Sequence, residues 1–112
     1  MADSNEFGLK PDVVNDIRSL LARFTSVTEA TLYGSRAKGN YQPGSDIDLT
    51  LKTKGETPKN LLLNIELEID NLDLPYSFDI SLLRQISNEN LLKHIERVGV
   101  VLHSAEQTKT TK

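Results

Sequence analysis

Hydrophobic residues recur at helical spacing in three stretches of the chain, residues 11–24, 57–72 and 87–99. In the first stretch the apolar positions follow steps of three and four, so they share one face of a helix: Val13, Val14, Ile17, Leu20, Leu21 and Phe24. Thr57 and Ser87 are residue types that cap helix N-termini, and a glycine ends the third stretch. The pattern therefore predicts three amphipathic helices.

Alternating polar and apolar residues predict the strands. The alternation is clearest in residues 46–52, where the apolar residues fall on one face: Ile47, Leu49 and Leu51. Residues 27–33 and 76–81 are typical of two further strands, and residues 100–102 of a short edge strand. From the order of these elements we predict an α/β (α+β) fold, a small mixed β-sheet with helices packed on its apolar face.

Length and composition indicate one ordinary globular domain. A chain of 112 residues is too short to divide into several domains. Residues 9–103 carry the periodic patterns and are expected to form the domain, whereas residues 1–8 and 104–112 lack such a pattern and are expected to be flexible tails. The chain contains no cysteine, which excludes disulfides, thiolate metal ligands and cysteine nucleophiles.

Charge and hydropathy disfavour two kinds of partner. The 13 basic and 16 acidic residues give a net charge of −3, and tryptophan is absent, so we expect no direct binding to nucleic acid. No stretch approaches the roughly 20 apolar residues of a membrane span. The first residues, MADSNEFGLK, contain no apolar signal core, so we expect a cytoplasmic protein that does not bind a membrane.

Asp46 and Asp48 are the first candidates for chemistry. Residues two positions apart on a strand project from the same face, with Cα atoms about 7 Å apart. Two carboxylates in this arrangement repel each other, and a divalent cation such as Mg²⁺, which prefers oxygen ligands, would relieve the repulsion. The alternative is a strand with an ordinary solvated polar face.

His94 and His103 show no metal-ligand spacing, and we expect His94 to be structural or exposed.

A glycine turn precedes this strand. Gly34 would let the backbone approach a phosphate closely, Ser35 would add a hydroxyl donor, and Arg36 and Lys38 would contribute positive charge. The alternatives are an ordinary Gly-Ser turn and a solvated basic turn. The segment has neither the Walker pattern nor the ligand spacing of an EF-hand.

The order of these features resembles the DNA polymerase beta-like nucleotidyltransferase superfamily. The superfamily pattern, a Gly-Ser turn followed by Asp-x-Asp on a strand, is present here as GSRAKG…SDIDL, with Asp46 eleven positions after Ser35. The resemblance covers residues 10–103 and is closest to the minimal, single-domain nucleotidyltransferases (MNT) of prokaryotes.

The resemblance implies a nucleotidyltransferase fold with a two-metal site. The family uses a third carboxylate on a later strand, and Asp79 matches that position; Asp70 and Asp73 are alternatives at a helix end or loop. Asp46, Asp48 and Asp79 would then hold two Mg²⁺ ions, Asp79 would help to deprotonate the acceptor hydroxyl, and the Gly-Ser turn would hold the β- and γ-phosphates of ATP. The implied nucleotide-binding residues lie in this turn and the loop after it: Gly34, Ser35, Arg36 and Ser45.

The resemblance also implies a partner. Single-domain members resemble the partners of HEPN-domain proteins in prokaryotic two-gene modules, in which the HEPN protein is an RNase toxin and the nucleotidyltransferase is its antitoxin. We therefore expect a Mg-dependent enzyme that transfers AMP from ATP to a hydroxyl acceptor, a tyrosine of such a toxin, within a hetero-oligomer.

Other functions remain open at this point. A non-catalytic nucleotide-binding module would neutralise or regulate its partner by contact alone. Transfer to a small molecule is disfavoured because the chain has no room for an acceptor domain. Leu63 and Leu67 lie off the main stripe of their helix and are candidate interface residues, unless they simply broaden its buried face.

Overall fold

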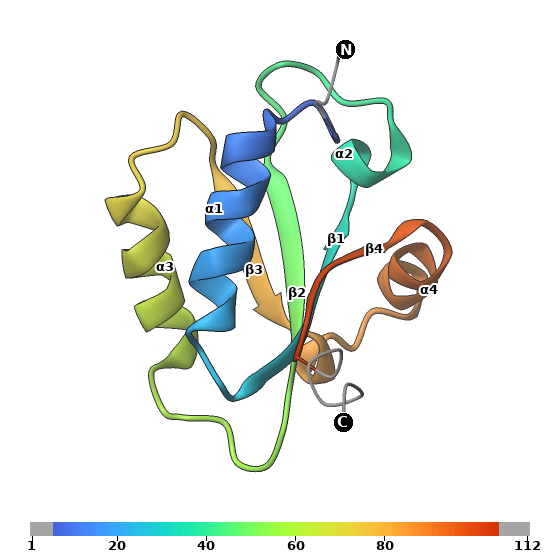
Figure 1. The fold of residues 1–112 in the computed structure, drawn as a ribbon. Helices are drawn as coiled ribbons and strands as arrows, with labels where there is room; N and C mark the ends of the chain where they lie inside the picture. The colour runs from blue at the N-terminus through green and yellow to red at the C-terminus, as the bar shows by residue number, and fades with distance from the viewer. Residues whose placement is uncertain (1–5, 106–112) are drawn as a thin grey trace, which may run out of the picture.

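The computed structural model describes residues 6–105 and shows a mixed β-sheet with helices on both faces (Figure 1). The elements follow one another in the order α1 (Pro11–Ala22), β1 (Val27–Tyr33), α2 (Ser35–Lys38), β2 (Ile47–Thr53), α3 (Leu61–Asn71), β3 (Phe78–Leu82), the 3₁₀ turn η1 (Leu83–Gln85), α4 (Glu89–Val98) and β4 (Val100–Ser104). The four strands are arranged β3-β2-β1-β4, with β1 antiparallel to both neighbours and β2 parallel to β3. The predicted fold class, a small mixed sheet with helices, is confirmed.

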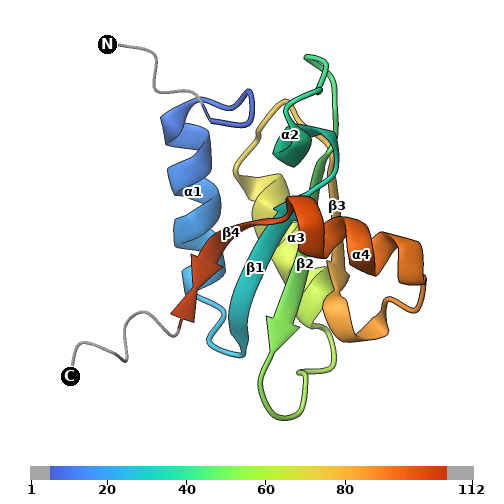
Figure 2. The same cartoon turned by 90° about the vertical axis from the view of Figure 1, so that its right-hand side faces the viewer.

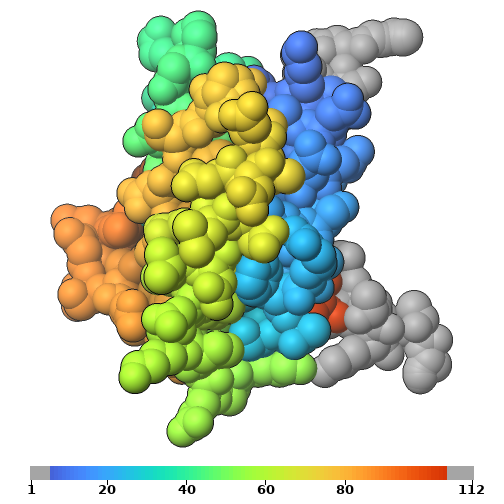
Figure 3. All heavy atoms as spheres, turned by 90° about the vertical axis from the view of Figure 1, so that its left-hand side faces the viewer, coloured from blue at the N-terminus to red at the C-terminus, as the bar shows by residue number. Residues whose placement is uncertain are grey.

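The hydrophobic core fills the space between one face of the sheet and helices α1 and α3, which lie side by side (Figure 3). Helix α1 buries the side chains that its periodicity predicts: Val13, Val14, Ile17, Leu20 and Leu21. In β2 the three alternating apolar residues are almost completely buried, and Leu51, the most accessible of them, is 1% exposed. Burial of this face fixes which side chains of β2 point away from the core.

Helix α4 lies against the opposite face of the sheet (Figures 1 and 2). Its apolar residues Leu92 and Ile95 border the same surface pocket as Thr31 of β1 and Val101 of β4. The prediction that the helices pack on the apolar face therefore holds for α1 and α3 but not for α4. The reason is that α4 has an apolar stripe of its own, which covers the second face of β1.

Helix α3 connects β2 to β3 as the crossover of a parallel βαβ unit. In this unit the two strands run in the same direction, so residues near the starts of both strands become neighbours. The register pairs Ile47 with Phe78 and Asp48 with Asp79. The crossover thus places two carboxylates that are distant in the sequence on adjacent strands.

The outer face of α3 carries two exposed leucines. Leu63 and Leu67 are each 52% exposed, so these residues do not broaden the buried face of the helix. Helix α3 itself begins at Leu61, and its N-cap position is Asn60 and not the predicted Thr57.

The N-cap of α4 is later than predicted as well, by one residue. The side chain of Asn88, not of Ser87, accepts the N–H of Leu91 at 3.0 Å. Gly99 follows the last residue of this helix, as the sequence predicts.

The ends of the domain extend slightly beyond the predicted limits. Glu6 and Leu9 form an isolated antiparallel bridge, and Ser104 is the last residue of β4, so residues 6–8 and 104 belong to the folded part. The remainder of the predicted tails, residues 1–5 and 106–112, lies outside the described residues. Across the described part of the chain, no helix is both long enough and apolar enough to cross a membrane.

Candidate active site

Gly34 turns the chain from β1 into α2 directly beside Asp48. Its φ of +81° lies in the region that favours glycine. A Cβ atom at this position would collide with Oδ2 of Asp48, so glycine is required by space as well as by backbone conformation. Ser35 follows as the first residue of α2 and is partly exposed. The Gly-Ser turn and the second aspartate of the motif therefore form one contiguous unit.

Arg36 is buried, although it was predicted to bind nucleotide. Its side chain is 2% exposed. The guanidinium donates three hydrogen bonds to main-chain carbonyls: those of Phe7 at 2.8 Å, Ser45 at 3.1 Å and Pro43 at 3.3 Å. It also lies over two aromatic rings: those of Tyr41 at 5.5 Å and Tyr76 at 5.2 Å from the ring centroids. These contacts give Arg36 a structural role, joining the N-terminal segment to the loop before β2, and each of its three nitrogens donates to a carbonyl.

Ser45 shapes the same loop. Its hydroxyl oxygen accepts the N–H of Gln42 at 2.8 Å, and its own N–H donates to the carbonyl of Gln42 at 3.0 Å. The side chain therefore closes a tight turn immediately before Asp46. The sequence prediction grouped Ser45 with the nucleotide-binding residues, whereas the structure gives its hydroxyl a local partner.

The carboxylates of Asp48 and Asp79 are neighbours across the parallel strands β2 and β3. Adjacent strands lie about 4.8 Å apart, which brings two such side chains within reach of one shared ion. Burial raises the pKa of Asp48, and the negative charges of Asp79 and then Asp46 raise it further. Asp46, in the residue before β2, and Asp79 are both exposed. The site therefore holds repelling negative charge around one partly buried carboxylate.

A layer of hydroxyl groups lies on the same face of the sheet. Tyr33, the last residue of β1, pairs with Asp48 in the sheet register. Burial raises the pKa of the Tyr33 phenol, its hydrogen bond with Ser81 acts in the opposite direction, and the charges of Asp79 and Asp48 add to the rise. The hydroxyl of Ser81 also donates to Oγ1 of Thr50 at 3.1 Å. These hydrogen-bonded side chains therefore share the face of the sheet that carries Asp48 and Asp79.

His94 reaches this site from α4. Its Nε2 accepts the N–H of Gly34 at 3.1 Å, and its ring meets the ring of Tyr33 edge-on, with centroids 6.2 Å apart and planes at 80°. Sequence reasoning placed His94 among structural or exposed residues. Its distance of 60 positions from Gly34 gives no local signal for this contact, which depends on α4 crossing the polar face of the sheet.

The donor chemistry of the site fits Mg²⁺, which binds oxygen ligands and commonly uses one or two carboxylates together with waters and phosphates. Asp48 and Asp79 provide two adjacent carboxylates, and Asp46 adds negative charge close to Asp48. Nevertheless, no group of three or more acidic or histidine side chains in residues 6–105 is placed to hold a metal ion. Waters and phosphate oxygens would supply the remaining ligands of a bound ion.

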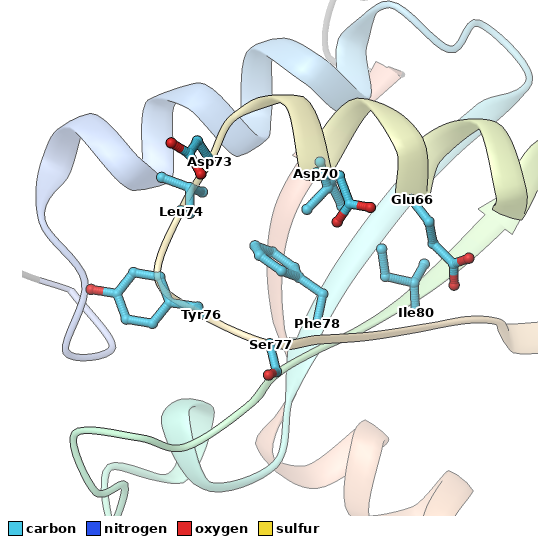
Figure 4. A pocket seen from close by; sticks show the side chains of 9 residues that line it. Glu66, Asp70, Asp73, Leu74, Tyr76, Ser77, Phe78 and Ile80 are labelled. Atoms are coloured by element: carbon cyan, nitrogen blue, oxygen red, sulfur yellow. The ribbon is translucent and has the colours of Figure 1, made fainter.

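A separate pocket of about 520 Å³ opens between α3 and β3 (Figure 4). Phe78 and Ile80 of β3 and Glu66 and Asp70 of α3 contribute to its lining. Phe78 and Ile80 flank Asp79 in the strand, and because successive side chains of a strand alternate, they point to the opposite face of the sheet. The pocket is thus distinct from the carboxylate site.

The family profile described as polymerase beta, nucleotidyltransferase, matches residues 15–108. This range includes the turn, the Asp-x-Asp strand and Asp79. The chain belongs to the polymerase beta nucleotidyltransferase family. A search of curated protein sequences finds no significant match to this nucleotidyltransferase.

Several solved structures share the fold of the nucleotidyltransferase. A toxin–antitoxin structure with AMP-PNP is 22% identical, with a TM-score of 0.66 over 88% of this chain and 78% of that chain. A structure of tri-AMPylated Shewanella oneidensis HEPN toxin in complex with MNT antitoxin contains a chain that is 20% identical, with a TM-score of 0.60 over 88% of this chain and 75% of that chain. The toxin–antitoxin MntA-HepT is 19% identical, with a TM-score of 0.62 over 91% and 79%. At these identities the likeness demonstrates the fold.

The predicted site residues fall into two groups in the structure of the nucleotidyltransferase. Gly34, Asp48 and Asp79 meet at one end of the sheet, with Ser35 at the start of α2 and Asp46 just before β2. The other group supports the loop before β2: Arg36 and Ser45. The site also contains two residues that the sequence prediction did not include: Tyr33 and His94.

Proposed function

We propose that this nucleotidyltransferase transfers AMP from ATP to a hydroxyl group on a partner protein. The observation that supports the proposal most directly is the register pair of Asp48 and Asp79 beside the Gly34 turn. Nucleotidyl transfer needs a place for the triphosphate and carboxylates for the reacting centre within one site. Both features occur here on the same face of the sheet.

The triphosphate would lie against the turn between β1 and α2. Ser35 offers a partly exposed hydroxyl, and Lys38 is exposed at the end of α2 and can contribute positive charge. Gly34 has no side chain to keep the phosphates away from the backbone. Arg36 is left out of this proposal as a phosphate ligand, because its guanidinium is buried and donates to carbonyls.

Mg²⁺ would be held by Asp48 and Asp79, with Asp46 completing the set of carboxylates that the family resemblance assigns to two ions. When bound, Mg²⁺ would neutralise phosphate charge and orient the triphosphate. The raised pKa of Asp48 supports this placement, because either a proton or a nearby cation would offset the unfavourable negative charge of its carboxylate in the folded protein. Asp46 and Asp79 are exposed and accessible to ions from solvent.

Transfer forms one bond and breaks another at the α-phosphorus of ATP. The acceptor oxygen bonds to the α-phosphorus, the bond from this phosphorus to the oxygen that bridges to the β-phosphate breaks, and pyrophosphate leaves. The proton of the acceptor hydroxyl passes to the exposed carboxylate of Asp79 and from there to solvent. The products are a nucleotidylated acceptor and pyrophosphate.

The acceptor in this proposal is a tyrosine of a HEPN-type RNase toxin, which makes the protein an antitoxin. Support comes from the structural neighbours, which include a tri-AMPylated HEPN toxin with its MNT antitoxin and a toxin–antitoxin with AMP-PNP. The described part of the chain is almost entirely occupied by the nucleotidyltransferase core, so the acceptor would be supplied by the partner in a hetero-oligomer.

The test is co-expression with a HEPN-domain toxin that the chain captures in a pull-down, followed by mass spectrometry of that toxin. We expect the addition of AMP to the HEPN protein with the wild-type chain, and loss of about two to three orders of magnitude in transfer rate with Asp79→Asn. Lys93→Ala, on the exposed surface of α4, is the matched control and should transfer at the wild-type rate.

Cell rescue separates transfer from contact. If Asp79→Asn binds the HEPN protein and fails to rescue cells, transfer is the mechanism. If it binds and rescues fully, the protein neutralises its partner by contact, as a non-catalytic nucleotide-binding module.

A further inference from the structure

The contact between His94 and Gly34 links α4 to the turn that begins α2. The N–H of Gly34 donates to Nε2 of His94 at 3.1 Å, and the same imidazole makes an edge-on ring contact with Tyr33, the residue just before Gly34. One side chain therefore holds two consecutive residues at the end of β1. Both contacts come from α4, and His94 lies 60 positions after Gly34 in the sequence.

We propose that His94 is a positioning residue that fixes the Gly34–Ser35 turn for the triphosphate. The inference rests on the proposed function, because it concerns the same nucleotide site. It assigns to α4 a part in nucleotide binding in addition to covering β1.

Gly34 is held between two elements. On one side it packs so closely on Asp48 that a Cβ atom would collide with Oδ2, and on another its N–H is bound by His94. Gly34 has a φ of +81°. Because glycine has no Cβ to restrict its backbone, it could also adopt several other conformations. The hydrogen bond to His94 removes part of this freedom before nucleotide arrives, which lowers the ordering penalty on binding.

The geometry also defines what His94 does not do. An imidazole nitrogen that accepts an N–H must be unprotonated, so the proton of neutral His94 is on Nδ1. Because Nε2 is occupied by Gly34, this nitrogen is not free to take a proton from an acceptor hydroxyl or to bind a metal ion. His94 therefore acts through Gly34, and its removal should affect nucleotide binding more than the chemical step.

Two substitutions separate the hydrogen bond from the ring contact. His94→Phe keeps an aromatic ring against Tyr33 and removes the acceptor, whereas His94→Gln removes the ring and offers an amide oxygen to the Gly34 N–H. Lys93→Ala is the control on the exposed side of α4. Thermal unfolding of each variant, followed by circular dichroism, identifies any that fails to fold, and His94→Asn then replaces it.

Calorimetry with ATP and Mg²⁺ measures the expected effect. We expect His94→Phe to raise the Kd for ATP about two- to tenfold, the range for loss of one neutral hydrogen bond, and to raise KM in the same ratio with kcat changed less than about twofold. His94→Gln should recover most of the affinity. Equal Kd values for wild-type and His94→Phe overturn the proposal, as does a fall in kcat with no change in KM.

Nuclear magnetic resonance tests the hydrogen bond without relying on activity. In the wild-type protein the Gly34 amide should exchange slowly with solvent and the His94 proton should be on Nδ1. Exchange should accelerate in His94→Phe and slow again in His94→Gln. If the wild-type chain binds no ATP, the proposed function fails, and the exchange pattern alone then decides whether His94 fixes the turn. An unprotected wild-type Gly34 amide would overturn the inference directly.

Discussion

The two faces of the sheet obey opposite physical requirements although the same strands form both. On the face covered by α1 and α3, the side chains of Ile47 and Leu49 are fully buried and exclude water. On the other face, Asp48 lies between these two residues in the same strand, partly buried and surrounded by negative charge. One face stabilises the fold, and the other holds charges that repel each other.

The difference shows how a small domain supports an electrostatically unfavourable site. Repulsion among Asp46, Asp48 and Asp79 would favour their separation, but the strands that carry Asp48 and Asp79 are locked in register by burial of the opposite face. The core therefore determines the spacing of the carboxylates. A substitution in the core should reduce stability, whereas a substitution that removes charge on the polar face should not.

The largest effect is expected in the core. Leu49→Ala removes a side chain that is 0% exposed and should lower the free energy of unfolding by about 2–5 kcal/mol. Urea denaturation followed by circular dichroism measures the change. Leu63→Ala, on the exposed face of α3, is the control and should change stability by less than about 0.5 kcal/mol. A loss below about 1 kcal/mol for Leu49→Ala would contradict the assignment of this face as the source of stability.

An intermediate effect on stability is expected at Gly34, in the turn after β1. Gly34→Ala combines an unfavourable φ with a collision against Asp48 and should cost about 1–3 kcal/mol or more. Gly39→Ala is a matched control, because Gly39 has a φ of +95° and open space around it. The difference between the two variants in denaturant unfolding isolates the collision. If Gly34→Ala lowers the free energy of unfolding no more than Gly39→Ala does, the close approach to Asp48 does not affect stability.

The smallest effect, and one of opposite sign, is expected for Asp48→Asn in metal-free buffer. Because the pKa of Asp48 is raised in the folded protein, folding favours its protonated form, and the charged form destabilises the fold above that pKa. A neutral amide at this position would remove the penalty, so the variant should match the wild type in acid and exceed it at neutral pH. The gain should open as pH rises from about 4 and stay below about 1 kcal/mol, since solvent screens the partly exposed group.

Thermal unfolding in EDTA between about pH 4 and pH 8 measures this difference. Mg²⁺ sharpens the comparison, because an ion bound only by the folded state should raise the Tm of the wild type and have less effect on Asp48→Asn. A neutral-pH loss of stability in Asp48→Asn would mean that the carboxylate is a structural acceptor instead of a repelling charge.

Local patterns in the sequence were sufficient for the strands, the first helix and the turn. Alternation in residues 46–52 separates core from polar face because side chains of a strand alternate with a period of two, and burial then selects the register. A glycine directly after the alternating residues 27–33 predicts the turn at position 34. These features depend on neighbours in the chain, so a single sequence determines them.

Contacts between distant segments were decided only by the tertiary structure. The sequence pattern placed α4 with the other helices, whereas its own apolar stripe packs it against the second face of β1 and brings His94 to Gly34. The sequence pattern placed Arg36 among the nucleotide-binding residues, yet in the folded protein its guanidinium donates to three carbonyls, one from the N-terminal segment and two from the loop before β2. A long side chain finds such partners only after the segments that supply them have packed together, which is why no local spacing predicts them.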